Sequence, residues 1–119
     1  MPRKLKNKAQ RLLRTKNNEQ YKTKYRNKPK WQMAIEFQNR FPDIPLINDP
    51  SHITGNRDMI FDVSQTALDL NFDGLMIETH TNPDKAWSDA AQQVTPAALV
   101  QIMEDLKIRK ETDAEVEYQ

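Results

Sequence analysis

Three side chains that can hold a metal ion stand at or after short apolar runs of this sequence. His52 follows the run at residues 44–49. Glu78 closes the run that begins at Leu75, and Asp89 lies in the polar loop beyond it. An imidazole with two carboxylates is a donor set that suits Mn, Fe, Co or Zn. The residue types alone leave a second interpretation open, namely a hydrogen-bonded loop histidine beside two solvated carboxylates.

Two strands and three helices are predicted to position these side chains. The runs at residues 44–49 and 75–78 have the length of buried parallel strands. Apolar residues at helical spacing predict helices over residues 31–41, 57–70 and 95–106. The expected packing faces are Trp31, Ala34, Ile35, Gln38 and Phe41, then Ile60, Val63, Ala67 and Leu70, and last Leu99, Ile102, Met103 and Leu106.

The order helix, strand, helix, strand, helix predicts an α/β fold whose parallel strands are buried on both faces. Residues 51–56 are expected to form a polar loop after the first strand. Because the carboxyl ends of parallel strands meet at one edge of a sheet, His52, Glu78 and Asp89 are expected to converge. We also expect Trp31, Trp87, Met76 and Met103 in the core or in the walls of a site.

Charge divides the chain into unlike parts. Residues 1–30 carry 12 of the 18 Lys and Arg but only one of the 17 acidic residues. Residues 1–20 are therefore predicted to be a basic arm, disordered or helical, because they hold too few apolar groups for a core. Such an arm attracts polyanions through their phosphates, but specific nucleic-acid binding is not expected. Residues 109–119 are expected to be a charged, frayed tail.

Length and composition narrow the choice of protein class. The 119 residues are about half of the roughly 250 that a closed (β/α)8 barrel needs. The chain has no cysteine, which excludes disulfides and thiolate ligands within it. The sequence contains no run of 18 apolar residues that would indicate a membrane span. Its basic N-terminus lacks the apolar segment of a signal peptide. A cytoplasmic location is expected.

Four linked motifs have a specific order and spacing. They are DPSH at residues 49–52, GNRD at 55–58, GLMIETH at 74–80 and SDAAQQ at 88–93. Together they closely resemble consecutive motifs of the 3-deoxy-arabino-heptulosonate 7-phosphate synthases, also called 3-deoxy-7-phosphoheptulonate (DAHP) synthases. The resemblance extends from about Tyr25 to Ile108.

The resemblance implies a fold and an activity. The part from residue 21 to residue 108 would be the C-terminal portion of a (β/α)8 TIM barrel, about strands 7–8 and helices 6–8. The parent enzyme would condense phosphoenolpyruvate with erythrose 4-phosphate in the shikimate pathway to the aromatic amino acids. A divalent metal (Mn, Fe, Co or Zn) would act as a Lewis acid on the aldehyde. The chain would be an incomplete and inactive fragment of a homo-oligomeric enzyme.

The resemblance also implies residue roles. His52, Glu78 and Asp89 match three of the family's four metal ligands, and the fourth is a cysteine that this chain lacks. Arg26 and Arg57 are candidate contacts for substrate phosphate, since guanidinium groups bind phosphate with two hydrogen bonds; a plain surface arginine is the alternative for Arg26.

Two further side chains are expected beside the metal ligands rather than among them. His80 lies two residues beyond Glu78 and so on the same face of an extended chain, which favours a supporting role over a ligand role. Asp49, in the same DPSH motif as His52, is assigned a supporting role as well.

Other interpretations stay open at this point. The closely related 3-deoxy-manno-octulosonate 8-phosphate synthases share a similar last strand and loop, although residues 50–52 and Gln92-Gln93 fit them less well. A non-enzymatic fragment that binds polyanions through its basic arm is the alternative from another class. Residues 105–110 resemble the junction that leads, in some of these synthases, into a fused chorismate mutase domain.

Overall fold

A computed structural model describes residues 25–108 of the chain. The predicted basic arm at residues 1–20 and the charged tail at residues 109–119 lie outside the described residues. In order, the elements are α2 (Trp31–Arg40), β1 (Ile47–Asn48), α3 (Pro50–Thr54), η2 (Arg57–Met59), α4 (Ile60–Asp69), β2 (Gly74–Leu75), η3 (Pro83–Lys85), η4 (Ala90–Gln92) and α5 (Pro96–Asp105).

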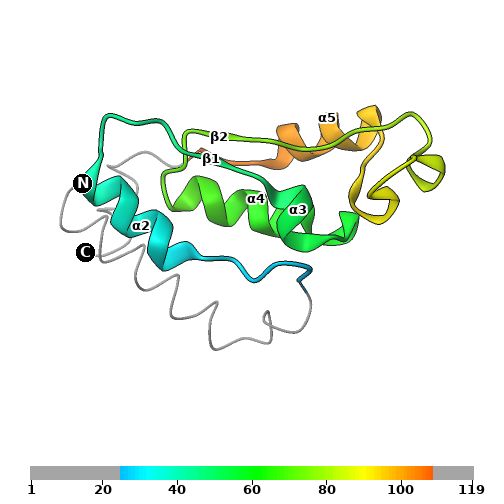
Figure 1. Cartoon of the computed structure of the whole chain (residues 1–119). Coiled ribbons are helices and arrows are strands. Elements are labelled where there is room, and N and C mark those ends of the chain that lie inside the picture. Colours follow the sequence, from blue (N-terminus) through cyan, green and yellow to red (C-terminus); the bar gives the residue numbers. More distant parts are fainter. Residues whose placement is uncertain (1–24, 109–119) are drawn as a thin grey trace.

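The two strands pair in parallel, as predicted. Ile47 lies opposite Gly74, and Asn48 lies opposite Leu75. The connection between the two strands runs through α3, η2 and α4, so the unit is a strand, a helical crossover and a parallel strand (Figure 1). The predicted α/β class is confirmed for the described part of the chain.

The core lies among α2, α4 and the turn that leads into β2. Its buried members are Trp31, Ile35, Val63, Ala67, Leu70 and Phe72. The rings of Trp31 and Phe72 meet edge to face with their centroids 5.9 Å apart, a favoured arrangement for aromatic pairs. The whole predicted face of the second helix is buried, whereas Phe41, expected on the face of the first helix, follows that helix and is half exposed.

The expected loop at residues 51–56 is wrong in part, because its first four residues belong to the short helix α3. The side chain of Asp49 caps this helix by accepting a hydrogen bond from the His52 N–H, and Pro50 stands at its first position. Gly55 ends it with φ of 60°, a conformation that favours glycine. His52 therefore projects from a capped helix.

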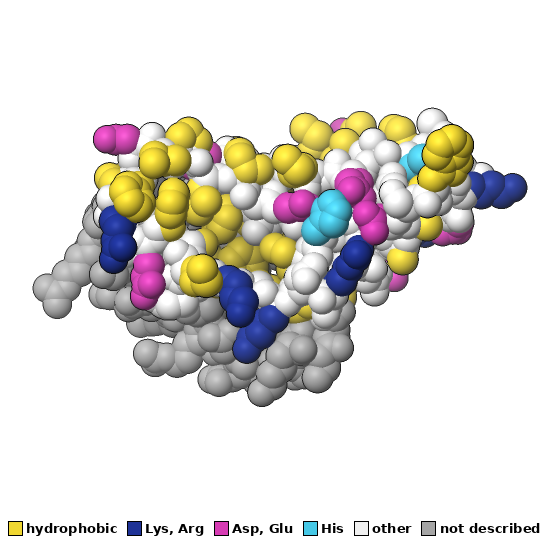
Figure 2. Space-filling view, viewed as in Figure 1, with side chains coloured by type: hydrophobic (Ala, Val, Ile, Leu, Met, Phe, Trp, Pro, Cys, Tyr) yellow, Lys and Arg dark blue, Asp and Glu magenta, His cyan; other side chains and the backbone are white. Residues whose placement is uncertain are grey.

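The strands are shorter than predicted, and they are not buried on both faces. Each has two residues, because within residues 25–108 each strand pairs only with the other. Ile47 and Met76 remain more than half exposed. Figure 2 shows hydrophobic side chains gathered on this open face.

The predicted helix from Thr95 is confirmed, but it packs less closely than expected. The Thr95 hydroxyl accepts a hydrogen bond from the Ala98 N–H, and Pro96 occupies the first position. None of its residues is buried. Met103, like Met76 and Trp87, is largely exposed, so none of these three side chains is in the core; Trp31 is in the core as expected. No helix in residues 25–108 is long and apolar enough to cross a membrane.

Candidate metal centre

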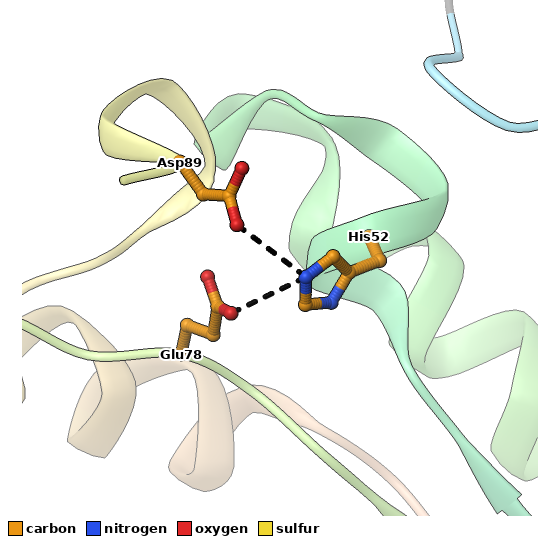
Figure 3. A group of neighbouring side chains, drawn as sticks. All are labelled: His52, Glu78 and Asp89. Atoms are coloured by element: carbon orange, nitrogen blue, oxygen red, sulfur yellow. Dashed lines mark ion pairs between the residues drawn. The ribbon is translucent and has the colours of Figure 1, made fainter. Parts of the chain in front are cut away.

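His52, Glu78 and Asp89 come from three separate segments and point toward one another (Figure 3). His52 lies on α3, Glu78 lies three residues beyond β2, and Asp89 directly precedes η4. The Nε2 atom of His52 is 3.3 Å from Oε1 of Glu78 and 3.5 Å from Oδ2 of Asp89. One ligand atom from each residue lies within 4.8 Å of the other two. The predicted convergence is confirmed.

The two distances from Nε2 of His52 fit a shared transition-metal ion. Ligand atoms at roughly 2.0–2.2 Å from one ion lie about 3–4.4 Å from one another. The neutral imidazole and the two carboxylates are also the donor types that such ions accept. The side chains are only partly buried, which leaves room for water or substrate at the same point. Their role as ligands stays a prediction.

Asp49 orients the imidazole of His52. Its Oδ2 lies 2.8 Å from Nδ1 of His52, while its Oδ1 caps the helix. The hydrogen bond with the Asp49 carboxylate raises the pKa of His52 against a smaller opposing effect of partial burial, and the carboxylates of Glu78 and Asp89 raise it further. With Nδ1 directed to Asp49, Nε2 is the nitrogen that faces the two acids.

Arg26 holds the second carboxylate. Its Nη1 donates to Oδ1 of Asp89 over 2.9 Å, and this hydrogen bond is the main cause of the lowered pKa of Asp89. The segment of Arg26 lies against α3, because the Arg26 N–H donates to the carbonyl of Thr54. A Cβ on Gly55 would lie 2.7 Å from Cβ of Arg26, so this approach requires glycine.

Gln92 and Ser51 hold Glu78, and neither role was predicted. The buried Gln92 side chain donates to Oε2 of Glu78 over 3.1 Å and accepts from Nη1 of Arg26 over 2.9 Å. The Glu78 N–H donates to the hydroxyl of the buried Ser51. Ser51 belongs to the DPSH motif and Gln92 to the SDAAQQ motif. Their presence in these motifs was the signal from which their roles could have been predicted.

Arg57 and His80 bond to residues other than the three converging side chains. Arg57 donates to the carbonyls of Ala90 and Gln93 and forms an ion pair of 2.9 Å with Asp84, so it braces the loop that carries Asp89. The Nδ1 atom of His80 accepts from the Asn82 N–H within its own turn. The predicted phosphate contact of Arg57 and supporting role of His80 stay predictions.

Comparisons with known proteins agree with the motifs. The model of the DAHP synthetase I family matches residues 8–117, which extends beyond the stretch that carries the motifs. Phospho-2-dehydro-3-deoxyheptonate aldolase of Thermotoga maritima is 31% identical over 74 residues, covering 62% of this chain and 22% of that protein. The chain thus spans less than a quarter of the length of this curated relative.

Solved structures show the same likeness. A truncated form of 3-deoxy-D-arabino-heptulosonate 7-phosphate synthase from Thermotoga maritima superposes with a TM-score of 0.59 and 26% identity, over 69% of this chain and 31% of that one. A second structure of the Thermotoga maritima enzyme gives the same TM-score over 69% of this chain and 24% of that one. Because the family model covers most of the sequence, the chain belongs to the DAHP synthetase I family.

Proposed function

We propose that this chain supplies the C-terminal part of a DAHP synthase barrel, about strands 7–8 and helices 6–8, together with three metal ligands. The complete enzyme condenses phosphoenolpyruvate with erythrose 4-phosphate and releases inorganic phosphate. The convergence of His52, Glu78 and Asp89 on one point is the observation that carries this proposal. The matched relatives are heptulosonate enzymes by name, which favours this activity over that of the octulosonate synthases.

The proposed centre holds a divalent Mn, Fe, Co or Zn ion. When bound, the ion supplies a Lewis acid that polarises a carbonyl group. The residues of this chain hold and orient the ligand atoms: Asp49 fixes the ring of His52, and Arg26 fixes the carboxylate of Asp89. Since the chain has no cysteine, a cysteine ligand of the kind the family resemblance implies must come from outside it.

Arg26 is the better placed of the two proposed phosphate contacts. Its side chain is 51% exposed and its guanidinium bonds to Asp89, so it borders the proposed metal site. Arg57 is less available to a phosphate, because its N–H groups already bond to the carbonyls of Ala90 and Gln93 and to the carboxylate of Asp84. We propose that Arg26 contacts a substrate phosphate while it holds Asp89, and that Arg57 contributes by supporting the loop.

The partner of the chain is the N-terminal portion of the barrel. Each strand pairs only with the other within residues 25–108, and the exposed Ile47 and Met76 form part of the uncovered face. Apolar strand faces of this kind are covered in a closed barrel. Homo-oligomerisation of the complete enzyme stays a prediction, and the likeness of residues 105–110 to the junction before a chorismate mutase domain stays an interpretation.

Phosphate release from phosphoenolpyruvate and erythrose 4-phosphate with added Mn2+ tests the proposal. We expect no measurable turnover by the 119-residue chain alone, because ligands on an incomplete sheet are not preorganised. The same chain joined to the upstream barrel portion of the Thermotoga maritima relative is expected to turn over.

The chain's two histidines provide a matched pair of variants. In the joined protein, His52→Ala is expected to abolish turnover, whereas His80→Ala is expected to retain most of it, because the imidazole of His80 accepts a hydrogen bond from the Asn82 N–H within its own turn. Metal-dependent turnover by the short chain alone would contradict the fragment proposal. Unchanged activity of the His52→Ala variant would contradict the proposed metal site.

A further inference from the structure

Each of the three converging side chains has two polar atoms, and in each only one faces the common point. The other is bonded to a neighbour: Nδ1 of His52 to Asp49, Oδ1 of Asp89 to Arg26, and Oε2 of Glu78 to Gln92. The atoms left over are Nε2 of His52, Oδ2 of Asp89 and Oε1 of Glu78. These are the three atoms that form the close contacts of the centre.

Gln92 links the two carboxylates into one network. Its amide nitrogen donates to Oε2 of Glu78, and its amide oxygen accepts from Nη1 of Arg26. The same Nη1 donates to Oδ1 of Asp89. The partners fix the orientation of the amide, because a flipped amide would set its oxygen against a carboxylate and its NH2 group against a guanidinium.

Gln92 is also held firmly in place. Its side chain is buried, with 1% of the residue exposed, and its backbone N–H donates to the carbonyl of Asp89. A buried amide keeps its partners because the loss of a buried hydrogen bond is costly. The adjacent Gln93 is different, since its side chain is half-buried and donates only to the carbonyl of Ser88.

We propose that Gln92 is a positioning residue that makes Glu78 and Asp89 each present a single oxygen to the metal. This inference rests on the proposed metal centre. Two carboxylates that give one oxygen each suit transition metals with few ligands. Ca2+ instead takes six to eight oxygens and often binds both atoms of a carboxylate. Gln92 therefore selects transition metals over Ca2+.

The test is an NMR titration of the 119-residue chain with Co2+, and separately with Ca2+, which reads binding without any need for activity. Gln92→Met preserves the length of the side chain but removes both hydrogen bonds. We expect it to weaken Co2+ binding about 10–100-fold, as is usual when a partner of a metal ligand is lost. The ratio of Co2+ to Ca2+ affinity is expected to fall as well. Gln93→Met, the matched control, is expected to change neither value by more than about twofold.

A second variant guards against loss of the fold. Gln92→Glu keeps the acceptor for Arg26 but sets a carboxylate against Glu78, so it too is expected to weaken Co2+ binding. Circular dichroism of each variant reports whether the helices persist. A folded Gln92→Met or Gln92→Glu chain that binds Co2+ as tightly as the unaltered chain would overturn the role of Gln92.

His52→Ala separates this inference from the proposed function. If His52→Ala leaves Co2+ binding unchanged, the metal centre itself is wrong, and the role of Gln92 falls with it. If His52→Ala weakens binding while the folded Gln92 variants do not, only the role of Gln92 is overturned. Weakening by both, with Gln93→Met unchanged, supports both proposals.

Discussion

Helices α4 and α5 have the same length but very different surroundings. Each has ten residues and an apolar face, yet α4 has five buried residues and α5 has none. The difference comes from their neighbours, because α4 packs against α3 and the core around Trp31 and Phe72. One side of the described unit is closed by its own residues, and the other side is open.

The open side is hollowed between α4, β2 and α5. A groove of about 470 Å³ lies there, lined mostly by apolar residues: Leu68, Asp73, Gly74, Leu75, Ile77, Leu99, Met103, Leu106 and Ile108. Apolar surface that stays in water contributes nothing to stability, since the hydrophobic free energy scales with the area removed from water. The closed side must therefore carry most of the stability of the isolated chain.

The largest expected effect is a difference between matched alanine substitutions in the two helices. Ile60→Ala, at a position with no exposed surface, is expected to cost about 2–5 kcal/mol in the free energy of unfolding. Ile102→Ala removes the same atoms from a partly exposed position of α5 and is expected to cost less than about half as much. Urea denaturation followed by circular dichroism measures both.

The outcome of this pair decides whether the two sides differ as described. If Ile60→Ala costs more than the chain's total stability, the variant is unfolded without urea, which the same spectrum detects. Equal costs for the two substitutions would show that α5 is packed as closely as α4, and the contrast between a closed and an open side would be lost.

A smaller effect concerns the proposed metal site, which is attached to the closed side through α3. If this side forms without the rest of a barrel, the contact between Asp49 and His52 must be present in the isolated chain. The pKa of His52, followed by its ring proton shifts in NMR, is then expected above the ordinary histidine value. Asp49→Asn is expected to lower it, because the substitution removes the main cause of the shift.

The sign of the pH dependence follows from this direction. Because the pKa of His52 is raised on folding, the stability that the charged ring contributes is fully present below the pKa of the unfolded chain. It is lost as the pH rises through the raised pKa of the folded chain. Protons also compete with a metal for Nε2, so metal binding is expected to weaken as the pH falls through the same range. An unshifted pKa of His52 would mean that the contact between Asp49 and His52 is not formed in the isolated chain.

Local patterns predicted the closed side well. The spacing of Ile60, Val63, Ala67 and Leu70 indicated a buried face, and all four are buried. The start of α5 at Thr95-Pro96 was also predicted from the sequence, because helix capping depends on residues close together in the chain. The short helix α3 was missed although Asp49, Pro50 and Gly55 carry its start and stop signals.

Features that depend on distant residues were predicted less well. Strand length was overestimated because a strand extends only where another strand pairs with it, and residues 25–108 contain two. The exposure of Met76 and Trp87 depends on what lies beside them, which their residue types do not indicate. The proposed role of Gln92 depends on its contacts with Arg26 and Glu78, which lie in two other segments of the chain. The SDAAQQ motif alone therefore did not indicate it.

The most direct test of the central claim is a crystal structure of the chain grown with Mn2+ or Co2+, with the ion located by its anomalous scattering. We predict one strong peak at about 2.0–2.3 Å from Nε2 of His52, Oε1 of Glu78 and Oδ2 of Asp89. A peak elsewhere in the chain, or a structure in which His52 and Glu78 lie too far apart to share one ion, would contradict the proposed metal centre.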